Sequence, residues 1–304
     1  MEYILETNNL TKRYGKHAAV NELSLHVKPG DIYGFIGRNG AGKTTFLKMV
    51  SGLSHPTSGE IVLFGDRGKE LISNNTFQKT GTLIENPGLY GNMTAFSNMK
   101  MKCLAMGRND KKYIEELMDL VGLANVGKKK VKQFSLGMRQ RLGIALALIG
   151  EPKLLLLDEP INGLDPQGIA EVRNTILRLN HEKNITIIIS SHILEELSKI
   201  ATSYAIIDTG KLVKELTKEQ LEANCESKIE IRTNNAQEAV RILKETGVEK
   251  LKAADDKTVY VMERFQETAY FNEILVKHNI QVEMLNVTNM SIEEYYLQLT
   301  GGAR

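Results

Sequence analysis

Eight residues decide the fold of this chain: Gly37-Arg38-Asn39-Gly40-Ala41-Gly42-Lys43-Thr44, which fit the spacing G-x-x-x-x-G-K-[ST]. The apolar run Ile32–Ile36 precedes them, and a helical pattern follows over residues 44–50. Between a strand and a helix, such glycines let successive backbone N–H groups surround phosphate oxygens at a helix N-terminus. The segment therefore predicts a nucleoside triphosphate site in an α/β protein with a parallel sheet.

The end of this segment carries the expected chemistry. We expect Lys43 to neutralise the β and γ oxygens and the Thr44 hydroxyl to ligate Mg²⁺. Thr45, the next residue, belongs to the expected nucleotide contacts as well. A glycine-rich turn with an incidental lysine is the alternative, and the flanking strand and helix argue against it.

A second motif is an apolar run that ends in two acids, Leu154–Leu157 followed by Asp158 and Glu159. Carboxylates after a buried strand are expected where its carboxyl end opens on a cation or on water. Asp158 is then the carboxylate on the Mg²⁺ side, and Glu159 is the candidate base that polarises the attacking water. A strand with an acidic turn is the alternative, and the upstream loop disfavours it.

Composition excludes several classes of protein. The 304 residues suggest two domains at roughly 150 residues each. With 39 basic against 37 acidic residues, the chain gives no electrostatic reason to expect a nucleic-acid partner. Charges interrupt every apolar stretch, the N-terminus lacks the pattern of a secretory signal, and two cysteines cannot form a disulfide framework. We expect a cytoplasmic protein with reduced thiols.

Pattern changes along the chain predict its domains. Strands alternate with helices over residues 1–215, interrupted by a helical insert over about 92–150. Residues 216–304 form the predicted C-terminal domain, with residues 212–225 as a linker. Its expected strands lie at 228–232, 248–251, 259–262 and 281–287, and its helices at 236–246 and 266–278. This βαββαβ order is that of a ferredoxin-like α+β fold. Ser291 and Glu294 are placed to cap a last helix.

Further motifs indicate which family of nucleoside triphosphatases the chain resembles. The segment Phe134-Ser135-Leu136-Gly137-Met138 lies shortly before the acidic strand, and His192 follows the apolar run Ile185–Ile189. Together with Tyr14 ahead of the phosphate loop, their order resembles that of the ATP-binding cassette (ABC) family over about residues 1–215. The resemblance implies a P-loop NTPase cassette with a RecA-like α/β core, an antiparallel β part and a helical insert.

The resemblance also implies roles for single residues. Tyr14 would stack on adenine, although a lone tyrosine is otherwise a surface residue. Ser135 and Gly137 would present a hydroxyl and N–H groups to the γ-phosphate of ATP held by a second cassette, and the alternative is a capped helix. His192 would bond the γ-phosphate and hold the water, making it catalytic together with Lys43 and Glu159. Asp165 would shape the opposite site, or it is a turn residue before a proline.

Two departures from the family pattern need attention. The usual signature LSGGQ keeps only its serine and second glycine here, at Ser135 and Gly137. Glu85 stands where most cassettes have a glutamine, and its carboxylate could ligate Mg²⁺ beside Thr44 and Asp158. Both departures resemble the bacitracin and lantibiotic exporter branch, whose cassettes also carry a C-terminal extension.

Two surfaces remain open to two interpretations each. The run Lys128–Lys132 is a solvated loop or a contact for lipid headgroups. The segment Pro87–Met101 is rich in adaptable apolar side chains. In cassettes this region receives the coupling helix of a membrane subunit, and core packing of the insert is the alternative.

The expected function is that of an ATPase subunit of an ABC transporter, with export of a peptide antibiotic, lantibiotic or other drug. Its expected partners are separate permease subunits and a second cassette, and its expected place is the inner face of the cell membrane. A soluble cassette acting on ribosomes or DNA is the alternative, and an ATP-dependent switch is a third. The C-terminal domain could regulate the cassettes, hold two cassettes together as a dimer, or be an extension that only packs.

Overall fold

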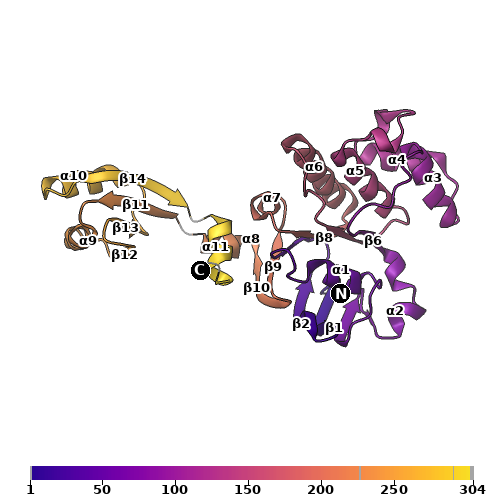
Figure 1. Cartoon of the computed structure of the whole chain (residues 1–304), viewed down its shortest axis with the longest axis horizontal. Coiled ribbons are helices and arrows are strands. Elements are labelled where there is room, and N and C mark those ends of the chain that lie inside the picture. The colour runs from indigo at the N-terminus through magenta and orange to yellow at the C-terminus, as the bar shows by residue number, and fades with distance from the viewer. Residues whose placement is uncertain (1, 226, 290, 302–304) are drawn as a thin grey trace. The chain divides into compact units, whose positions relative to one another are not determined.

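The computed structural model describes residues 2–225, 227–289 and 291–301. The chain divides into two compact units, Met1–Lys218 and Glu219–Arg304. We describe each unit by itself (Figure 1).

A six-stranded sheet forms the centre of the first unit in the described residues. Its order is β10-β9-β3-β8-β7-β6, and every neighbouring pair is parallel except β9 with β10. All residues of β3 and β7 are buried, as expected for strands covered on both faces. The strands are β3 (Ile32–Ile36), β6 (Thr80–Leu83), β7 (Leu154–Asp158), β8 (Thr186–Ser191), β9 (Ser203–Asp208) and β10 (Lys211–Thr217).

Helices pack against this sheet and complete the α/β core. The phosphate-loop helix α1 contacts β7, α5 contacts β6, and α6 contacts β8. Phe35 of β3 stacks on Phe46 of α1 with ring centroids 4.5 Å apart, so the loop between them is fixed at both ends. The predicted parallel α/β sheet is confirmed. These helices are α1 (Lys43–Val50), α5 (Leu136–Ala147), α6 (Pro166–Lys183) and α7 (Leu194–Ser198).

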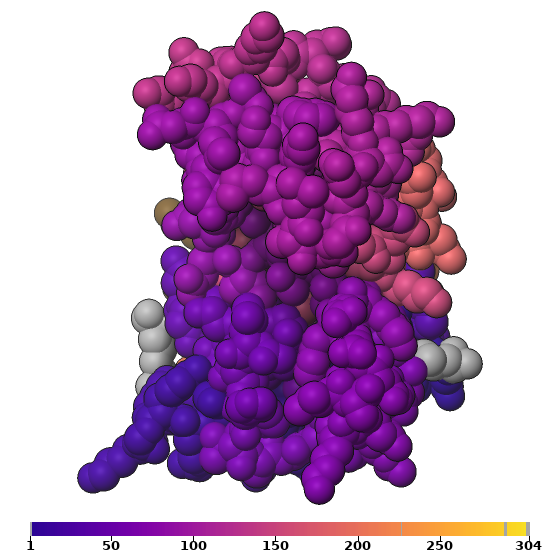
Figure 2. All heavy atoms as spheres, turned by 90° about the vertical axis from the view of Figure 1, so that its right-hand side faces the viewer, coloured from indigo at the N-terminus to yellow at the C-terminus, as the bar shows by residue number. Residues whose placement is uncertain are grey.

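A separate antiparallel sheet and a helical insert flank this core. Figure 2 shows one face of the molecule, with the atoms of the insert in magenta above and those of the N-terminal segments in indigo below. The sheet has the order β2-β1-β4-β5, and Tyr14 pairs with His17 at the β1–β2 turn. Polar side chains cap the insert helices: Thr94 begins α3 and Asp110 begins α4. The bounds are β1 (Leu5–Tyr14), β2 (His17–Val27), β4 (Ser58–Leu63), β5 (Asp66–Arg67), α2 (Glu70–Ser73), α3 (Ala95–Ala105) and α4 (Lys111–Leu120).

The second unit has a four-stranded antiparallel sheet of order β12-β13-β11-β14 in the described residues. With α9 and α10 between the strands, this is the ferredoxin-like βαββαβ arrangement. The capping box at Ser291 and Glu294 begins α11 as predicted. The elements are β11 (Ser227–Thr233), α9 (Ala236–Glu245), β12 (Leu251–Ala253), β13 (Thr258–Val261), α10 (Thr268–Lys277), β14 (Val282–Asn289) and α11 (Ile292–Leu299).

The predicted linker over residues 212–225 is wrong. Its first part belongs to strand β10, which pairs antiparallel with β9, and its second part is helix α8 (Lys218–Asn224). Thr209 and Gly210 both have positive φ, 46° and 80°, which is the backbone of a tight hairpin turn. That turn brings Leu216 back against the core, where it is buried.

The predicted strand at 248–251 is also misplaced, since β12 begins at Leu251. Gly247 has a φ of 83° just after α9, and the Val248 N–H bonds to the Leu243 carbonyl. Val248 is buried because this helix ending turns it into the core. The sequence pattern does not distinguish an apolar residue that follows a helix from the first residue of a strand.

In the described ranges no helix combines the length and apolarity needed to cross a bilayer. Cys103 and Cys225 are both free, one buried and one half-buried.

The buried Tyr33 predicts a loss of stability in alkali. Its hydroxyl donates to Glu215 Oε1 at 2.5 Å, and burial first, then the Glu215 charge, raises the Tyr33 pKa well above its usual 10.0. The folded state therefore holds this proton more tightly than the unfolded state. The resulting stability is complete below pH 10 and falls by about 1.4 kcal/mol per pH unit above it. In urea unfolding from pH 8 to 11, Tyr33→Phe should lack this component, whereas the exposed Tyr90→Phe should keep it. Parallel curves for wild type and Tyr33→Phe would contradict the assignment.

Candidate nucleotide site

The site lies beyond the carboxyl ends of β3, β7 and β8, where parallel strands commonly bind ligands. A pocket of about 350 Å³ opens there between the phosphate loop and the β1–β2 turn. Most of its lining residues are among those predicted from sequence, whereas His17 and Ala19 were missed. The pocket is lined by Tyr14, His17, Ala19, Asn39, Gly40, Gly42, Lys43, Thr44, Thr45 and Glu159.

Glycine shapes the loop by conformation and by contact. Gly40 and Gly42 have φ values of 83° and 102°, which side-chain-bearing residues rarely adopt. A Cβ on Gly42 would lie 2.3 Å from the Ala19 carbonyl oxygen, so the loop presses directly on strand β2. Gly42 also begins α1 without any side-chain cap, which leaves the first N–H groups of the helix to an anion.

Lys43 is held over the loop by carbonyl oxygens. The side chain is almost completely buried, and Nζ donates to Gly37 O at 2.6 Å and to Arg38 O at 3.2 Å. Nζ also lies 3.1 Å from Glu159 Oε1. The ammonium therefore has two neutral partners and one carboxylate, an environment that suits a phosphate oxygen in place of the carboxylate.

The Asp158 carboxylate is fixed between two hydroxyl groups. Thr44 Oγ1 donates to Oδ2 at 2.7 Å, and Ser190 Oγ donates to Oδ1 at 2.5 Å. Ser190 Oγ also accepts a hydrogen bond from the Glu159 N–H at 2.9 Å. Ser190 was not predicted, although two serines ending an otherwise apolar strand were a usable signal. It joins the two acids of the site to strand β8.

The Glu159 carboxylate contacts both Lys43 and His192. The Glu159 φ of 48° places the backbone in the left-handed region, and Oε2 lies 2.8 Å from His192 Nδ1. The other oxygen, Oε1, is buried and lies 3.1 Å from Lys43 Nζ, so one carboxylate contacts both the lysine and the histidine. The structure thus brings Lys43, Glu159 and His192 together.

Other predicted residues lie outside the lining of this pocket. Ser135 caps α5 by accepting from the Met138 N–H at 3.2 Å, and Gly137 lies in the first turn of that helix. Asp165 caps α6 in the same way, through the Gly168 N–H at 3.0 Å. Glu85 forms an ion pair with Lys48 at 2.6 Å. Of the three residues predicted for Mg²⁺, the structure joins Thr44 to Asp158 and pairs Glu85 elsewhere.

The residues offer part of a magnesium site. No group of three or more His, Cys, Asp or Glu side chains arranged for a metal occurs in the residues that the structure describes. Mg²⁺ in phosphate-transfer sites needs few protein ligands, because phosphates and water complete its octahedron. The Thr44 hydroxyl and the Asp158 carboxylate, 2.7 Å apart, fit that donor set.

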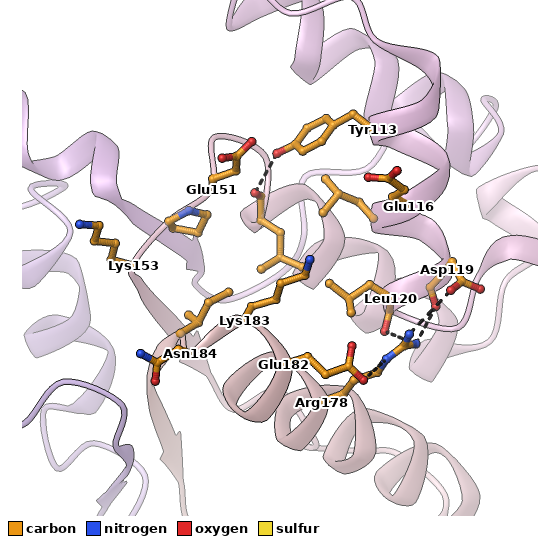
Figure 3. A pocket seen from close by; sticks show the side chains of 14 residues that line it. Tyr113, Glu116, Asp119, Leu120, Glu151, Lys153, Arg178, Glu182, Lys183 and Asn184 are labelled. Atoms are coloured by element: carbon orange, nitrogen blue, oxygen red, sulfur yellow. Dashed lines mark hydrogen bonds and ion pairs between the residues drawn. The ribbon is translucent and has the colours of Figure 1, made fainter.

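A second hollow, of about 580 Å³, opens beside the amino ends of β7 and β8 and differs in chemistry (Figure 3). Its arginine is already paired with acids of the lining: Arg178 contacts Glu182 at 2.9 Å and Asp119 at 3.8 Å. The Tyr113 hydroxyl donates to the Leu148 carbonyl. Four carboxylates also line it, which disfavours a polyphosphate: Glu116, Asp119, Glu151 and Glu182.

Comparison with known proteins gives concordant results. The family model described as ABC transporter matches residues 20–162. The chain is 39% identical over 302 residues to the bacitracin transport ATP-binding protein BcrA of Enterococcus faecalis, covering 99% of this chain and 98% of that one. It is 45% identical over 212 residues to the lantibiotic transport ATP-binding protein SrtF of Streptococcus pyogenes, covering 70% and 90%.

A solved structure supports the fold. CbiO1 of Clostridium perfringens, part of an ABC transporter complex, aligns with a TM-score of 0.66 and 24% identity. The alignment covers 73% of this chain and 92% of that one.

The contact of Gly42 with Ala19 predicts unequal effects of alanine at two loop glycines. Both Gly40→Ala and Gly42→Ala place a side chain at positive φ, but a Cβ at Gly40 meets nothing within 4 Å. We expect Gly40→Ala to cost about 1 kcal/mol of unfolding free energy. Gly42→Ala should cost about 1–3 kcal/mol more, because strand β2 must move. Urea unfolding measures both, and equal losses would refute the contact argument.

Proposed function

The chain belongs to the ABC transporter family of ATP-binding proteins, and on this basis we propose that it hydrolyses ATP to drive export of a peptide antibiotic through separate membrane subunits. The observation that carries the proposal is the convergence of Lys43, Glu159 and His192 beside the Thr44–Asp158 pair. The lysine, glutamate and histidine suit a γ-phosphate and its attacking water. The Thr44–Asp158 pair suits the metal that accompanies ATP.

Binding of ATP follows from the loop and its surroundings. The backbone N–H groups of the glycine-rich loop, from Gly37 to Thr45, receive the phosphates, and Lys43 supplies the positive charge. The exposed ring of Tyr14, at the mouth of the pocket, stacks on adenine. Thr44 and Asp158 would hold Mg²⁺, which would neutralise charge on the phosphates.

Hydrolysis needs a positioned water, and Glu159 is the base for it. The backbone of Glu159 is fixed through its N–H bond to Ser190, so its carboxylate has a defined position. Glu159 accepts the proton of the water as the water attacks the γ-phosphorus in line; the bond from that phosphorus to the β–γ bridging oxygen breaks, and ADP and phosphate leave. His192, 2.8 Å from Glu159, donates to the γ-phosphate and keeps the water in place, while Lys43 stabilises the charge that develops.

The active form requires two cassettes. One chain contains one phosphate loop, and Ser135 and Gly137 lie outside the lining of its pocket. The cap of α5 is a helix N-terminus that would face the γ-phosphate bound by the other cassette. A second copy of this chain or a paralogue supplies the complementary half.

Exposed apolar side chains of the helical insert support a membrane partner. Tyr90 is 57% exposed and Leu104 is 51% exposed, with Met93 and Met101 also exposed. Such side chains in one short segment suit a protein partner. We propose that they receive the permease, which holds the chain at the inner face of the cell membrane. The exposed Lys128–Lys130 segment would then lie near anionic lipid.

The change of sequence pattern near residue 215 divides the chain into two proposed domains. Residues 1–215 form the proposed ATP-binding domain, with its helical insert over about 92–150, and residues 216–304 form an accessory domain. The relatives named for bacitracin and lantibiotic transport make peptide antibiotics the proposed cargo class.

The base assignment predicts that Glu159→Gln abolishes turnover and keeps ATP binding. Loss of a general base lowers kcat by about 100- to 10,000-fold. Steady-state ATPase assays and equilibrium binding of ATP measure the two properties separately. Glu151→Gln, which removes an exposed carboxylate paired with Arg108, is the matched control and should keep wild-type turnover. Substantial hydrolysis by Glu159→Gln would refute the assignment.

Isolation from the native membrane tests the proposed function. The tagged chain, extracted from its native cells in mild detergent, should carry a polytopic membrane protein in fixed ratio, as identified by mass spectrometry. Deletion of the chain should sensitise the cells to a peptide antibiotic. Recovery of ribosomal or DNA-repair proteins without any permease would instead assign the ATPase to a soluble machine.

A further inference from the structure

Lys12 contacts the tyrosine that lines the nucleotide pocket. Its ammonium lies over the Tyr14 ring, 5.2 Å from the ring centroid. The two residues are two positions apart on strand β1, so their side chains leave the strand on the same face. A cation at this distance is attracted to the negative face of an aromatic ring. Lys12 is therefore bound to Tyr14 by a contact that the sequence motifs did not indicate.

A carbonyl oxygen outside the strand fixes the same ammonium. Lys12 Nζ donates to the His55 carbonyl at 2.6 Å, in the segment that follows helix α1. That segment is attached to β1 on both sides of Lys12. The Thr57 N–H donates to the Thr11 carbonyl at 2.8 Å, and Thr57 Oγ1 accepts from the Arg13 N–H at 3.0 Å. The ammonium is thus anchored to a segment that is itself fixed to the strand.

The Tyr14 ring receives little support from the protein core. Tyr14 is 53% exposed, and exposed side chains exchange rotamers on the picosecond to nanosecond timescale. A base that stacks on a mobile ring must immobilise it, which costs entropy on binding. A contact that already holds the ring in the free protein lowers this cost. Because Lys12 covers one face of the ring, the opposite face is left for a flat base.

We propose that Lys12 is a positioning residue of the adenine subsite, which holds the Tyr14 ring in the orientation that stacks on the base. This inference rests on the proposed function, in which Tyr14 binds adenine. Lys12 acts through the ring and not on the phosphates. Its effect on ATP affinity therefore requires both the ring of Tyr14 and the base of the nucleotide.

A double-mutant cycle on the full chain tests this requirement. The variants are Lys12→Met, Tyr14→Ala and the two combined, and the measurement is equilibrium binding of ATP with Mg²⁺ by calorimetry. Lys12→Met should weaken ATP binding by about twofold to fivefold, the range of an exposed cation–ring contact. The double variant should bind ATP as Tyr14→Ala does, because no ring remains to be held. Lys12→Arg keeps a cation over the ring and should restore wild-type affinity.

Two controls separate the ring contact from a general effect of charge. Inorganic tripolyphosphate has no base, so Lys12→Met should bind it as wild type does, measured by its inhibition of ATP binding. Unchanged tripolyphosphate binding also shows that the variant is folded. Lys16→Met removes the same charge from an exposed position of the β1–β2 turn, two residues after Tyr14, and should leave ATP affinity unchanged.

Several results would overturn the inference while the proposed function stands. They are wild-type ATP affinity in Lys12→Met, a further loss when Lys12→Met is added to Tyr14→Ala, no rescue by Lys12→Arg, and an equal loss for tripolyphosphate or in Lys16→Met. Unchanged ATP affinity in Tyr14→Ala would instead refute adenine stacking. A wild-type chain that fails to bind ATP would refute the proposed function itself.

Discussion

The site depends on one buried carboxylate held between two hydroxyl groups. Asp158 accepts from Thr44, which is 114 positions away in sequence, and from Ser190, which is 32 positions away. These bonds join the helix of the phosphate loop, the acidic strand and strand β8 at a single point. Hydrogen bonds to a charged group contribute about 1.5–3 kcal/mol each. Because Ser190 also fixes the Glu159 N–H, the position of the proposed base follows from the same contact.

The segment from Tyr90 to Cys103 holds apolar side chains in two environments. Met99 and Cys103 are completely buried on α3, while Tyr90 and Met101 are exposed. Core packing and the proposed contact with a permease would therefore use different side chains of one short segment. Adaptable apolar residues serve each purpose, which is why their type alone could not separate the two.

Sequence predicted what is local in this chain. The phosphate loop, its strand and helix, the acidic strand and the Ser291 cap are each contained in a short segment, and the fold around them is confirmed. The features that the sequence analysis missed are contacts with residues in other segments of the chain. Strand β10 pairs with β9, Ser190 donates a hydrogen bond to Asp158, and Lys48 forms an ion pair with Glu85. The strand predicted at 248–251 is misplaced for another reason. A buried residue after a helix, such as Val248, and the first residue of a strand have the same hydrophobic character.

The pairing of β3 has a consequence for how the protein is made. Ile32 pairs with Ile187 and Tyr33 with Ser203, so both neighbours of this strand are synthesised more than a hundred residues after it. Until β8 leaves the ribosome, the strand that bears the phosphate loop has neither neighbour, and the second neighbour follows only with β9. Such non-local pairing is slow to form and exposes apolar strands meanwhile. The sheet that supports the nucleotide site can therefore be completed only late in synthesis of this unit.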